Sequence, residues 1–387
     1  MAIVGCGTIA PTHVDAITAE PGIGVRVVAC CDIDDVMARE FGEKYGIPAV
    51  TWADLLADPA VDAVSICTPS GVHADLGVET MRAGKHVLIE KPLDITPDAC
   101  ERLIDAQRES GKVLACVSQH RFDPATIFVR EAIQRGDIGA VALAEARITW
   151  YRTQQYYDSG DWRGTWALDG GGCLMNQGVH TVDLMLWLCG RATSVYAQTR
   201  TLGHDRIEVE DCVAATVTFE NGAIGTIIAS TAAYPGFPVR LAVHGTLGTA
   251  VMEGDALQTY AVMGEKTVYG HPAAAHAVGI ATGGTRSMST ASTAIPEPTP
   301  LPQPLSPPGK GEPARTDGET DDGEFPGAPA KWGDSHRAQI ADFARCCRTG
   351  EKPLVDGVQA KAAVDLILAV YESARTGQIV KLGPARS

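Results

Sequence analysis

A glycine-rich turn near the first residue constrains the fold more than any other feature of the sequence. The apolar run Ala2 to Gly5 predicts a short β-strand, and Pro11 to Thr18 predicts a helix. Between them the chain reads Gly5-Cys6-Gly7-Thr8-Ile9-Ala10. In such a strand-turn-helix pattern the glycines let the backbone approach a pyrophosphate, which lies at the N-terminus of the helix. The turn therefore predicts an α/β sheet that binds a dinucleotide.

Short Val- and Ile-rich runs alternate with helical stretches from Met1 to about Ser118, which predicts a doubly wound parallel sheet. The predicted strands are Ala2 to Gly5, Val25 to Cys31, Ala63 to Thr68, His86 to Glu90 and Leu114 to Ser118. The predicted helices are Ala53 to Leu56 and Ala74 to Ala83, with Gly84 as a C-cap. The first strand has almost no residues ahead of it, so either it is clipped or the true start lies upstream of Met1.

An acidic residue at the end of the second predicted strand indicates which cofactor the turn would bind. Asp32 lies 22 residues beyond Ala10, where a carboxylate would accept hydrogen bonds from the ribose hydroxyls of NAD. The same carboxylate would repel the 2′-phosphate of NADP, and the next residue is Ile33 rather than a basic one. The alternative is an acidic helix cap. We expect NAD binding, with NADP disfavoured.

Beyond Asp123 the pattern changes to strands with a period of two and hairpin signals. The clearest example is Val213, Ala215, Val217 and Phe219, followed by Asn221-Gly222. Helical spacing occurs in His180 to Leu188 and again near Val358 to Ala374. These features predict a second domain of the α+β class, built on a large, mostly antiparallel sheet.

A proline-rich segment interrupts the second domain. Ten of the 23 prolines fall between Pro296 and Pro329, and Phe325 is the one aromatic residue among them. Such a composition cannot build a core, so we expect a disordered insertion at residues 281–331, with a functional lid as the alternative. The predicted domains are then residues 1–120, which bind the dinucleotide, and residues 121–280 with 332–387, which bind substrate and form oligomer contacts.

Composition narrows the classes of partner. The net charge is −15 and the isoelectric point about 5.1, so nucleic acid and anionic membranes are disfavoured. No basic leader or export signal is visible, and we expect a cytoplasmic protein. The eleven cysteines are odd in number and contain no Cys-x-x-Cys pair, which favours reduced, mostly buried thiols over disulfides or a metal site.

Two groups of polar residues lie where parallel strands are predicted to end, which is where open α/β sheets bind ligands. The first is Thr68-Pro69-Ser70 with His73, and the second is Glu90-Lys91-Pro92. Besides the glycine turn, the candidate cofactor contacts are Thr68, Pro69, His73, Glu90 and Lys91. Lys91, between a carboxylate and a proline, could have a lowered pKa and hydrogen-bond a reacting hydroxyl. A solvated surface lysine is the alternative.

A third group follows a run of glycines that begins after Asp169. Asn176 and His180 are four residues apart, so a helix would place both on one face, and Asp183 could share that face. The glycines would let the backbone come close to a ligand, and a histidine exchanges protons near neutral pH. A structural histidine is the alternative.

Together these groups resemble the Gfo/Idh/MocA family of oxidoreductases, named after glucose-fructose oxidoreductase, inositol dehydrogenase and a rhizopine catabolism protein. The resemblance covers about residues 1–260 and 332–382 and depends most on Glu-Lys-Pro after a Rossmann half. The family's catalytic lysine matches Lys91 and its histidine matches His180. Its usual third member, an aspartate four residues before that histidine, is Asn176 here, so the proton relay would rest on Lys91 and His180.

The resemblance implies that NAD and substrate meet between a Rossmann domain and an open antiparallel sheet, and that this sheet forms dimer or tetramer contacts. The candidate substrate-pocket residues are Gln119, His120, Arg121, Tyr151, Trp162, Arg163, Trp166, Asn176 and His180. Aromatic rings stack on sugars while arginine and amide groups bind hydroxyls, although ordinary packing is an alternative for each residue.

The expected function is transfer of a hydride between NAD and a hydroxyl-bearing carbon of a sugar or cyclic polyol, inositol- or pyranoside-like, with no metal. One alternative is a nucleotide-sugar dehydrogenase. Another is a non-catalytic NAD-binding sensor or repressor, which the presence of both Lys91 and His180 disfavours.

Overall fold

The structure is a computed structural model that describes residues 1–264, 269–270 and 333–383. The chain divides into two compact units, of which one comprises residues 1–270 and 327–387. The other unit, residues 271–326, lies outside the described residues, and so does the predicted insertion at residues 281–331. Two sheets with their helices make up the described part of the first unit.

The first sheet has five parallel strands in the order β2-β1-β3-β4-β5. Its strands are β1 (Ala2–Val4), β2 (Ala29–Cys31), β3 (Ala63–Ile66), β4 (His86–Ile89) and β5 (Leu114–Cys116). This confirms the predicted doubly wound sheet, and each predicted strand is present in a shorter form. The strand order reverses between β1 and β3, and the carboxyl ends of these two strands form the expected cofactor crevice.

Five helices belong to this sheet: α1 (Ala10–Thr18), α2 (Asp35–Tyr45), α3 (Trp52–Ala57), α4 (His73–Arg82) and α5 (Pro97–Ser110). Local sequence sets their ends. The side chains of Asp34, Thr51 and Thr96 accept hydrogen bonds from the first-turn amides of α2, α3 and α5. Gly46 and Gly111 end α2 and α5, each with a φ of +67° that other residues rarely adopt.

The second sheet has nine strands in the order β13-β12-β11-β10-β6-β9-β8-β7-β14. Its strands are β6 (Val141–Thr149), β7 (Ala192–Arg200), β8 (Cys212–Phe219), β9 (Ile224–Ser230), β10 (Arg240–Gly245), β11 (Gly248–Glu253), β12 (Ala256–Val262), β13 (Tyr269–Gly270) and β14 (Val380–Lys381). Neighbouring strands are antiparallel except for the pair β6 and β9. The mostly antiparallel sheet is therefore confirmed, including the β8-β9 hairpin, where Gly222 has a φ of +87°.

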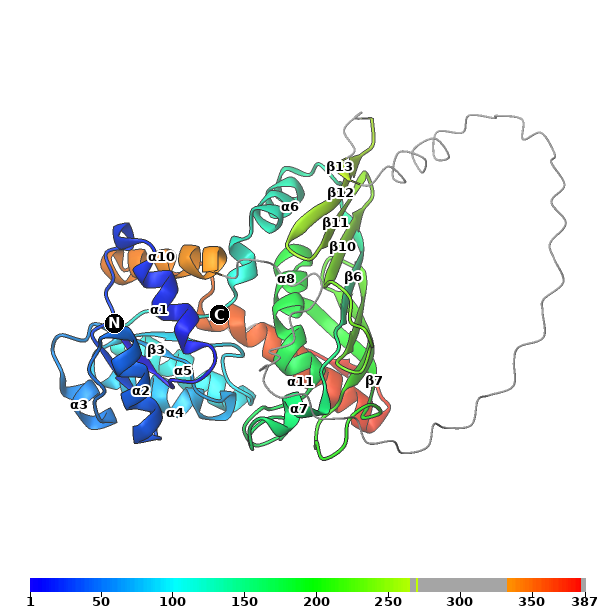
Figure 1. Ribbon diagram of the computed structural model, residues 1–387. Helices are drawn as coiled ribbons and strands as arrows, with labels where there is room; N and C mark the ends of the chain where they lie inside the picture. Colours follow the sequence, from blue (N-terminus) through cyan, green and yellow to red (C-terminus); the bar gives the residue numbers. More distant parts are fainter. Residues whose placement is uncertain (265–268, 271–332, 384–387) are drawn as a thin grey trace, which may run out of the picture. The chain divides into compact units, whose positions relative to one another are not determined.

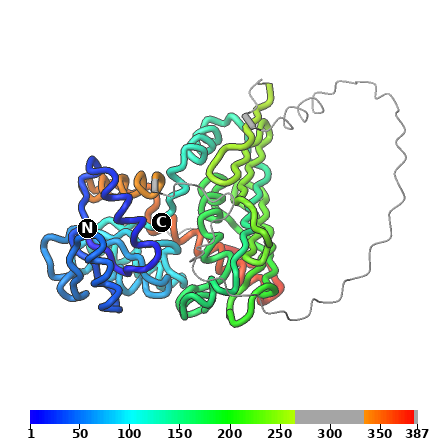
Figure 2. The backbone as a smooth tube through the Cα atoms, in the orientation of Figure 1, coloured from blue at the N-terminus to red at the C-terminus, as the bar shows by residue number. Residues whose placement is uncertain are grey.

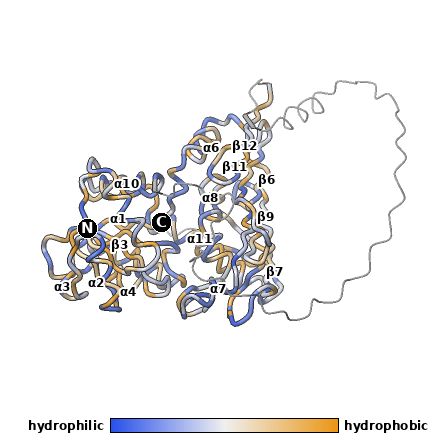
Figure 3. The backbone as a smooth tube through the Cα atoms, viewed as in Figure 1, coloured by the Kyte–Doolittle hydropathy of each residue, from blue (hydrophilic) through white to orange (hydrophobic). Residues whose placement is uncertain are grey.

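Helices α8 (Val179–Cys189) and α11 (Gly357–Thr376) cover one face of this sheet (Figure 1). The other helices of the described residues are α6 (Pro124–Arg135), α7 (Gln154–Asp158) and α10 (Gly333–Thr349), with the short helices η1 (Pro21–Ile23), η2 (Ser70–Val72) and η3 (Gln119–Phe122) and the π-helix η4 (Cys173–Gly178). Hydrophobic and hydrophilic residues are interspersed along the chain in both sheets and in their helices (Figure 3). No helix among the described residues is long and apolar enough to cross a membrane.

Helix α10 comes from the C-terminal part of the chain but lies beside α1 (Figure 2). Ile340 and Phe343 of α10 share a buried cluster with Ile17 of α1. The sequence had assigned all of residues 332–387 to the second domain. We propose that α10 belongs with the dinucleotide-binding half and that α11 belongs with the large sheet.

A buried ion pair joins the two halves. Arg121 of η3 donates from Nε to Oδ2 of Asp183 in α8 (2.8 Å) and from Nη2 to Oδ1 (2.6 Å). Their side chains are only 3% and 6% exposed. The same guanidinium donates to the Leu354 carbonyl and the Gln359 side chain, and the Ser118 hydroxyl also donates to Asp183. This network fixes the start of α8 against the end of β5.

Replacing Arg121 by Met should lower the free energy of unfolding by about 3–5 kcal/mol, because Asp183 would remain buried without its partner. Urea titration followed by circular dichroism measures the change. The matched control is Arg102→Met, which removes an equally short but exposed pair with Asp75 and should cost about 1 kcal/mol or less. A loss at Arg121 no larger than the control's would contradict the structural role.

Candidate active site

The glycine turn after β1 has the shape that a dinucleotide needs. Gly5 has a φ of +86°, and a Cβ there would lie 2.7 Å from the Cys67 carbonyl carbon, so the end of β3 excludes any side chain. Around Gly7 nothing lies within 4 Å of where a Cβ would be, which leaves its backbone open to a ligand. Thr8 is exposed, Ile9 is half-buried and Ala10 is fully buried at the first turn of α1.

Asp32 follows β2, and its side chain contacts the glycine turn. Its Oδ2 accepts a hydrogen bond from the Cys6 amide (2.7 Å), and its Oδ1 accepts one from the Asp34 amide (2.9 Å). Each oxygen keeps a further acceptor site, so the carboxylate can also accept ribose hydroxyls. The open face of Gly7 and this carboxylate fit NAD.

The residues predicted after β3 lie at the same crevice but act differently. Thr68 Oγ1 is buried and has no hydrogen-bond partner among the described residues, and Pro69 is half-buried beside it. His73 is fully buried, with Nδ1 2.9 Å from the Pro92 carbonyl oxygen and Nε2 3.0 Å from that of Thr68. The His73 ring therefore links the loops that follow β3 and β4, and its contact with the cofactor stays a prediction.

Glu90 also points inward rather than toward a cofactor. Its Oε1 lies 2.7 Å from Nε2 of His13, whose Nδ1 lies 2.9 Å from the Ser65 hydroxyl. Burial alone would raise the pKa of Glu90, but the hydrogen bond to His13 brings that pKa down to about 2. Glu90 is thus a buried anion that supports the loop carrying Lys91. His13, three residues beyond the glycine turn, was not predicted.

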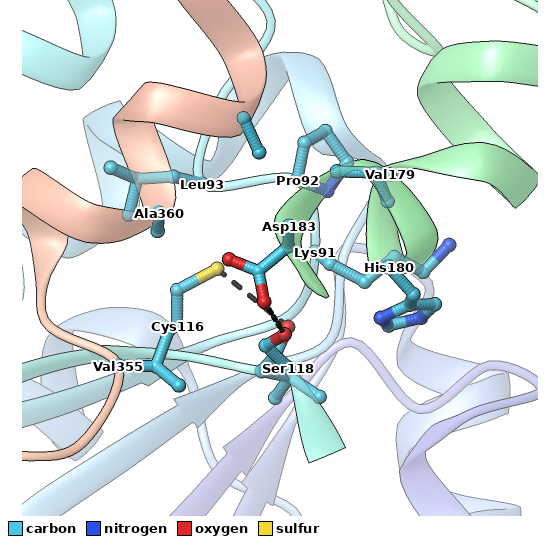
Figure 4. A pocket seen from close by; sticks show the side chains of 12 residues that line it. Lys91, Pro92, Leu93, Cys116, Ser118, Val179, His180, Asp183, Val355 and Ala360 are labelled. Atoms are coloured by element: carbon cyan, nitrogen blue, oxygen red, sulfur yellow. Dashed lines mark hydrogen bonds between the residues drawn. The ribbon is translucent and has the colours of Figure 1, made fainter. Parts of the chain in front are cut away.

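Lys91, after β4, meets the second half of the chain. Its Nζ donates to the backbone oxygen of Asn176 (2.9 Å) and lies 3.4 Å from that residue's Oδ1. Burial lowers the pKa of Lys91, although Glu90 and Asp169 oppose this shift. Lys91 and His180 line one pocket whose walls come from both halves (Figure 4). The structure thus brings together the three residues that were predicted to be catalytic.

The surroundings of His180 keep its ring neutral. Burial lowers the pKa of His180 well below its usual value, and the nearby His120 and Lys91 lower it further. The His120 ring lies 5.3 Å from that of His180, edge to face. Burial alone would lower the pKa of His120, but hydrogen bonds to Asp123 (2.7 Å) and Asp255 (3.3 Å) raise it to about 9. A neutral imidazole has one ring nitrogen that can accept a hydrogen bond from a hydroxyl, although burial and the two neighbouring cations oppose its full protonation.

His120, Asp123 and Asp255 also form the one group among the described residues whose side chains could together hold a metal ion. Their ligand atoms lie within 4.8 Å of one another. Each already has a partner in the cluster, and the Ser335 hydroxyl donates to Asp123.

Asn176 belongs to the π-helix η4 rather than to an α-helix, and a carboxylate lies behind it. Its Nδ2 donates to Oδ1 of Asp169 (2.6 Å), whose Oδ2 accepts a hydrogen bond from the Gly164 amide (2.9 Å). Burial raises the pKa of Asp169. The sequence showed Asp169 at the start of the glycine run but gave it no role.

The glycine run makes room for protein rather than for a ligand, which corrects the prediction. A Cβ on Gly172 would lie 1.7 Å from the backbone oxygen of Glu210, and one on Gly171 would lie 2.2 Å from the Tyr371 hydroxyl. The Glu210 carboxylate accepts hydrogen bonds from the amides of Gly172 (2.8 Å) and Leu174 (2.9 Å). Glu210, which was not predicted, therefore holds the start of the π-helix.

Two predicted pocket residues at the end of β5 lie in the interior. Arg121 donates its hydrogen bonds to Asp183, Leu354 and Gln359, and its contact with substrate stays a prediction. Gln119 is 3% exposed, and its Oε1 has no hydrogen-bond partner among the described residues.

The remaining candidates belong to an aromatic loop that follows β6. Tyr151 packs edge to face against Tyr234 at 5.2 Å, and the half-exposed Trp166 packs in the same way against Tyr371 at 5.4 Å. Trp162 stacks on the Arg163 guanidinium at 4.5 Å.

Two arginines of this loop share one aromatic ring. Arg163 and Arg152 lie over the ring of Tyr156 at 4.3 Å and 4.7 Å. Arg163 also donates from Nη1 to the Tyr156 hydroxyl (2.7 Å), to which Gln177, the neighbour of Asn176, donates from Nε2 (3.1 Å). Two guanidinium groups thus lie close to the π-helix.

Comparison with known proteins agrees with this geometry. Residues 1–118 match the oxidoreductase family with an NAD-binding Rossmann fold, and residues 127–251 match the GFO/IDH/MocA C-terminal domain. The oxidoreductase YrbE of Bacillus subtilis is 30% identical over 67% of this chain and 75% of its own length. Inositol 2-dehydrogenase 2 of Saccharopolyspora erythraea is 27% identical over 66% of this chain and 74% of its own length.

Among solved structures, the WlbA dehydrogenase of Bordetella pertussis, in complex with NADH and UDP-GlcNAcA, superposes with a TM-score of 0.77. It is 29% identical, and the match covers 99% of this chain and 98% of that one. The resemblance seen in the sequence is therefore confirmed: the chain belongs to the Gfo/Idh/MocA family of oxidoreductases, which carry an NAD-binding Rossmann fold.

Proposed function

We propose that this oxidoreductase transfers a hydride between NAD and a hydroxyl-bearing carbon of a sugar or cyclic polyol. The observation that carries the proposal is that Lys91 and His180 line one pocket beyond the carboxyl end of β4, where Asn176 contacts Lys91. The Asp32 carboxylate and the open Gly7 turn, at the carboxyl ends of the same sheet, suit NAD. The similarity to a relative named inositol 2-dehydrogenase 2 supports a polyol as substrate.

In the oxidation direction the neutral His180 ring accepts the proton of the substrate hydroxyl. The Lys91 ammonium donates a hydrogen bond to the same oxygen and stabilises the negative charge that develops on it. Asn176 holds Lys91 in place through its two oxygens. When bound, NAD supplies the acceptor for the hydride that leaves the carbon. The products are a carbonyl compound, NADH and the proton on His180.

A nucleotide-linked sugar is a second candidate substrate. The WlbA structure, in complex with NADH and UDP-GlcNAcA, supports it. The arginines that share the Tyr156 ring would suit the negative charges of a diphosphate or a sugar acid. Turnover with inositols and hexoses but not with UDP-linked sugars would favour the first candidate, and the reverse pattern would favour the second.

We further propose that the protein is cytoplasmic and forms a homodimer or homotetramer through the large sheet. One face of this sheet is covered by α8 and α11, while the other exposes apolar side chains. Ile224 and Ile228 of β9 are 58% and 46% exposed, and Tyr196 of β7, two strands away, is 41% exposed. Exposed apolar side chains on a sheet favour association with a second copy.

The protein should prefer NAD to NADP by at least about tenfold in kcat/KM, because Asp32 would repel the 2′-phosphate. Asp32→Asn keeps the shape of the side chain and removes its charge, so it should reduce this preference without improving use of NAD. Steady-state kinetics with both cofactors measures the ratio. Equal kcat/KM values in the unaltered protein would contradict the assignment of Asp32.

Lys91→Met and His180→Asn should each lower kcat by about 10²-fold or more, because each removes a group that acts on the same proton and charge. The double variant should be little worse than either single variant. NADH affinity, measured by fluorescence, should change little. Lys352→Met, at an exposed position, is the matched control. Near-normal kcat in Lys91→Met would remove its catalytic assignment and favour a non-catalytic NAD-binding role.

A further inference from the structure

Position 176 holds an amide where the family usually has an aspartate, so the site lacks its expected carboxylate. The acidic residues next to Lys91 and His180 in the sequence do not replace it. Glu90 is paired with His13, and Asp183 is paired with Arg121. Asp169 is different, because its carboxylate accepts a hydrogen bond from the side chain of Asn176, which in turn contacts Lys91.

The hydrogen bonds determine how the amide of Asn176 is turned. A carboxylate only accepts hydrogen bonds, so Asp169 Oδ1 at 2.6 Å selects the nitrogen of the amide. The amide oxygen must then face the other way, and Lys91 Nζ lies 3.4 Å from it. The backbone amide of Gly164 holds the Asp169 carboxylate in this orientation.

We infer that Asp169 is a positioning residue of this active site: it holds the Asn176 amide with its oxygen toward Lys91 and supplies the negative charge that position 176 lacks. Asp169 touches neither substrate nor cofactor in this account. It acts on the reaction by keeping Lys91 charged and in place. The kinetic part of the inference rests on the function proposed above.

Several other charged groups act on Lys91. Those that face it are Glu90, Asp169, Arg163 and Arg152, together with the neighbouring His180. Burial and the two arginines lower the pKa of Lys91, while Glu90 and Asp169 raise it. Glu90 makes the larger of the two contributions, but it is paired with His13 and does not touch Asn176. Asp169 adds the next contribution and also fixes the amide whose oxygen contacts Lys91.

Asp169→Asn is a sharp test because the two side chains have the same shape. Residue 169 must still accept the Gly164 amide, so its new NH2 group would face the NH2 group of Asn176. The Asn176 amide should then rotate and point its nitrogen at Lys91, where two donors repel each other. The double variant Asp169→Asn/Asn176→Asp restores one carboxylate and one amide in reversed order, and it should recover the lost interaction.

The first readout needs neither substrate nor cofactor. The protein is labelled with 13C at the lysine Cε, and the Lys91 NMR signal is identified by its absence in Lys91→Met. The chemical shift of this signal as a function of pH follows protonation of Nζ. In Asp169→Asn the midpoint should move to lower pH by about one unit, since an opposite charge has been removed. The double variant should return it toward the original value, and Asp161→Asn, at an exposed position of the same loop, should not move it.

The second readout is the pH profile of kcat. Lys91 acts as an ammonium, so its loss of a proton sets the alkaline limb, and this limb should shift to lower pH in Asp169→Asn. The acid limb, set by His180, should stay. At the pH optimum kcat of Asp169→Asn should fall about tenfold or more, because Lys91 is no longer held in its orientation. The double variant should recover kcat. The KM for NAD should change little in either variant.

An unchanged Lys91 titration in Asp169→Asn would overturn the inference, even if kcat fell, because that pattern indicates a structural role alone. Failure of the reversed pair to restore the titration would also overturn it. If Asp169→Asn does not fold, Asn176→Leu removes the amide oxygen from Lys91 while Asp169 keeps its charge and its contact with Gly164. The Lys91 midpoint should then fall by less than one unit, and an unchanged midpoint would overturn the inference. Absence of turnover with every polyol would count against the proposed function and leave the titration result standing.

Discussion

The buried ion pair between Arg121 and Asp183 is the contact on which the site depends. Asp183 lies one turn beyond His180 on α8, and Arg121 follows β5, the strand next to the one that carries Lys91. Two desolvated charges with several hydrogen bonds tolerate little displacement, so the pair fixes α8 relative to the parallel sheet. His180 is thereby held beside Lys91, and η4, which precedes α8 directly, brings Asn176 into contact with the lysine.

Electrostatics then divides the roles between the two reactive groups. Burial and two neighbouring cations keep His180 neutral, while the carboxylates of Glu90 and Asp169 oppose the effect of burial on the pKa of Lys91. A neutral base and a charged hydrogen-bond donor can therefore act on one hydroxyl oxygen at the same pH. Other buried groups hold the segments that carry the site. The pair of His13 and Glu90 supports the loop with Lys91, and the Glu210 carboxylate holds the start of the π-helix with Asn176.

The sequence was sufficient for features encoded within a few residues. Strand-turn-helix periodicity predicted the parallel sheet, the Asn221-Gly222 turn predicted a hairpin, and Glu-Lys-Pro marked Lys91. Contacts with distant partners could not be predicted from the sequence: Glu90 is hydrogen-bonded to a residue 77 positions away, and Arg121 to one 62 positions away. The sequence placed both residues at strand ends without showing which way their side chains point. The glycine run was ambiguous in a similar way. Glycine is needed wherever another group comes close to the backbone, whether that group belongs to the protein or to a ligand.

A ternary complex tests the central claim most directly. A crystal structure of the Lys91→Met variant with NAD and a polyol or sugar substrate would trap the reactants without turnover. The account predicts that the reacting hydroxyl lies within about 2.6–3.2 Å of a ring nitrogen of His180, with its carbon facing C4 of the nicotinamide. A substrate bound away from His180, or a nicotinamide whose C4 faces away from the pocket lined by residues 91 and 180, would contradict it.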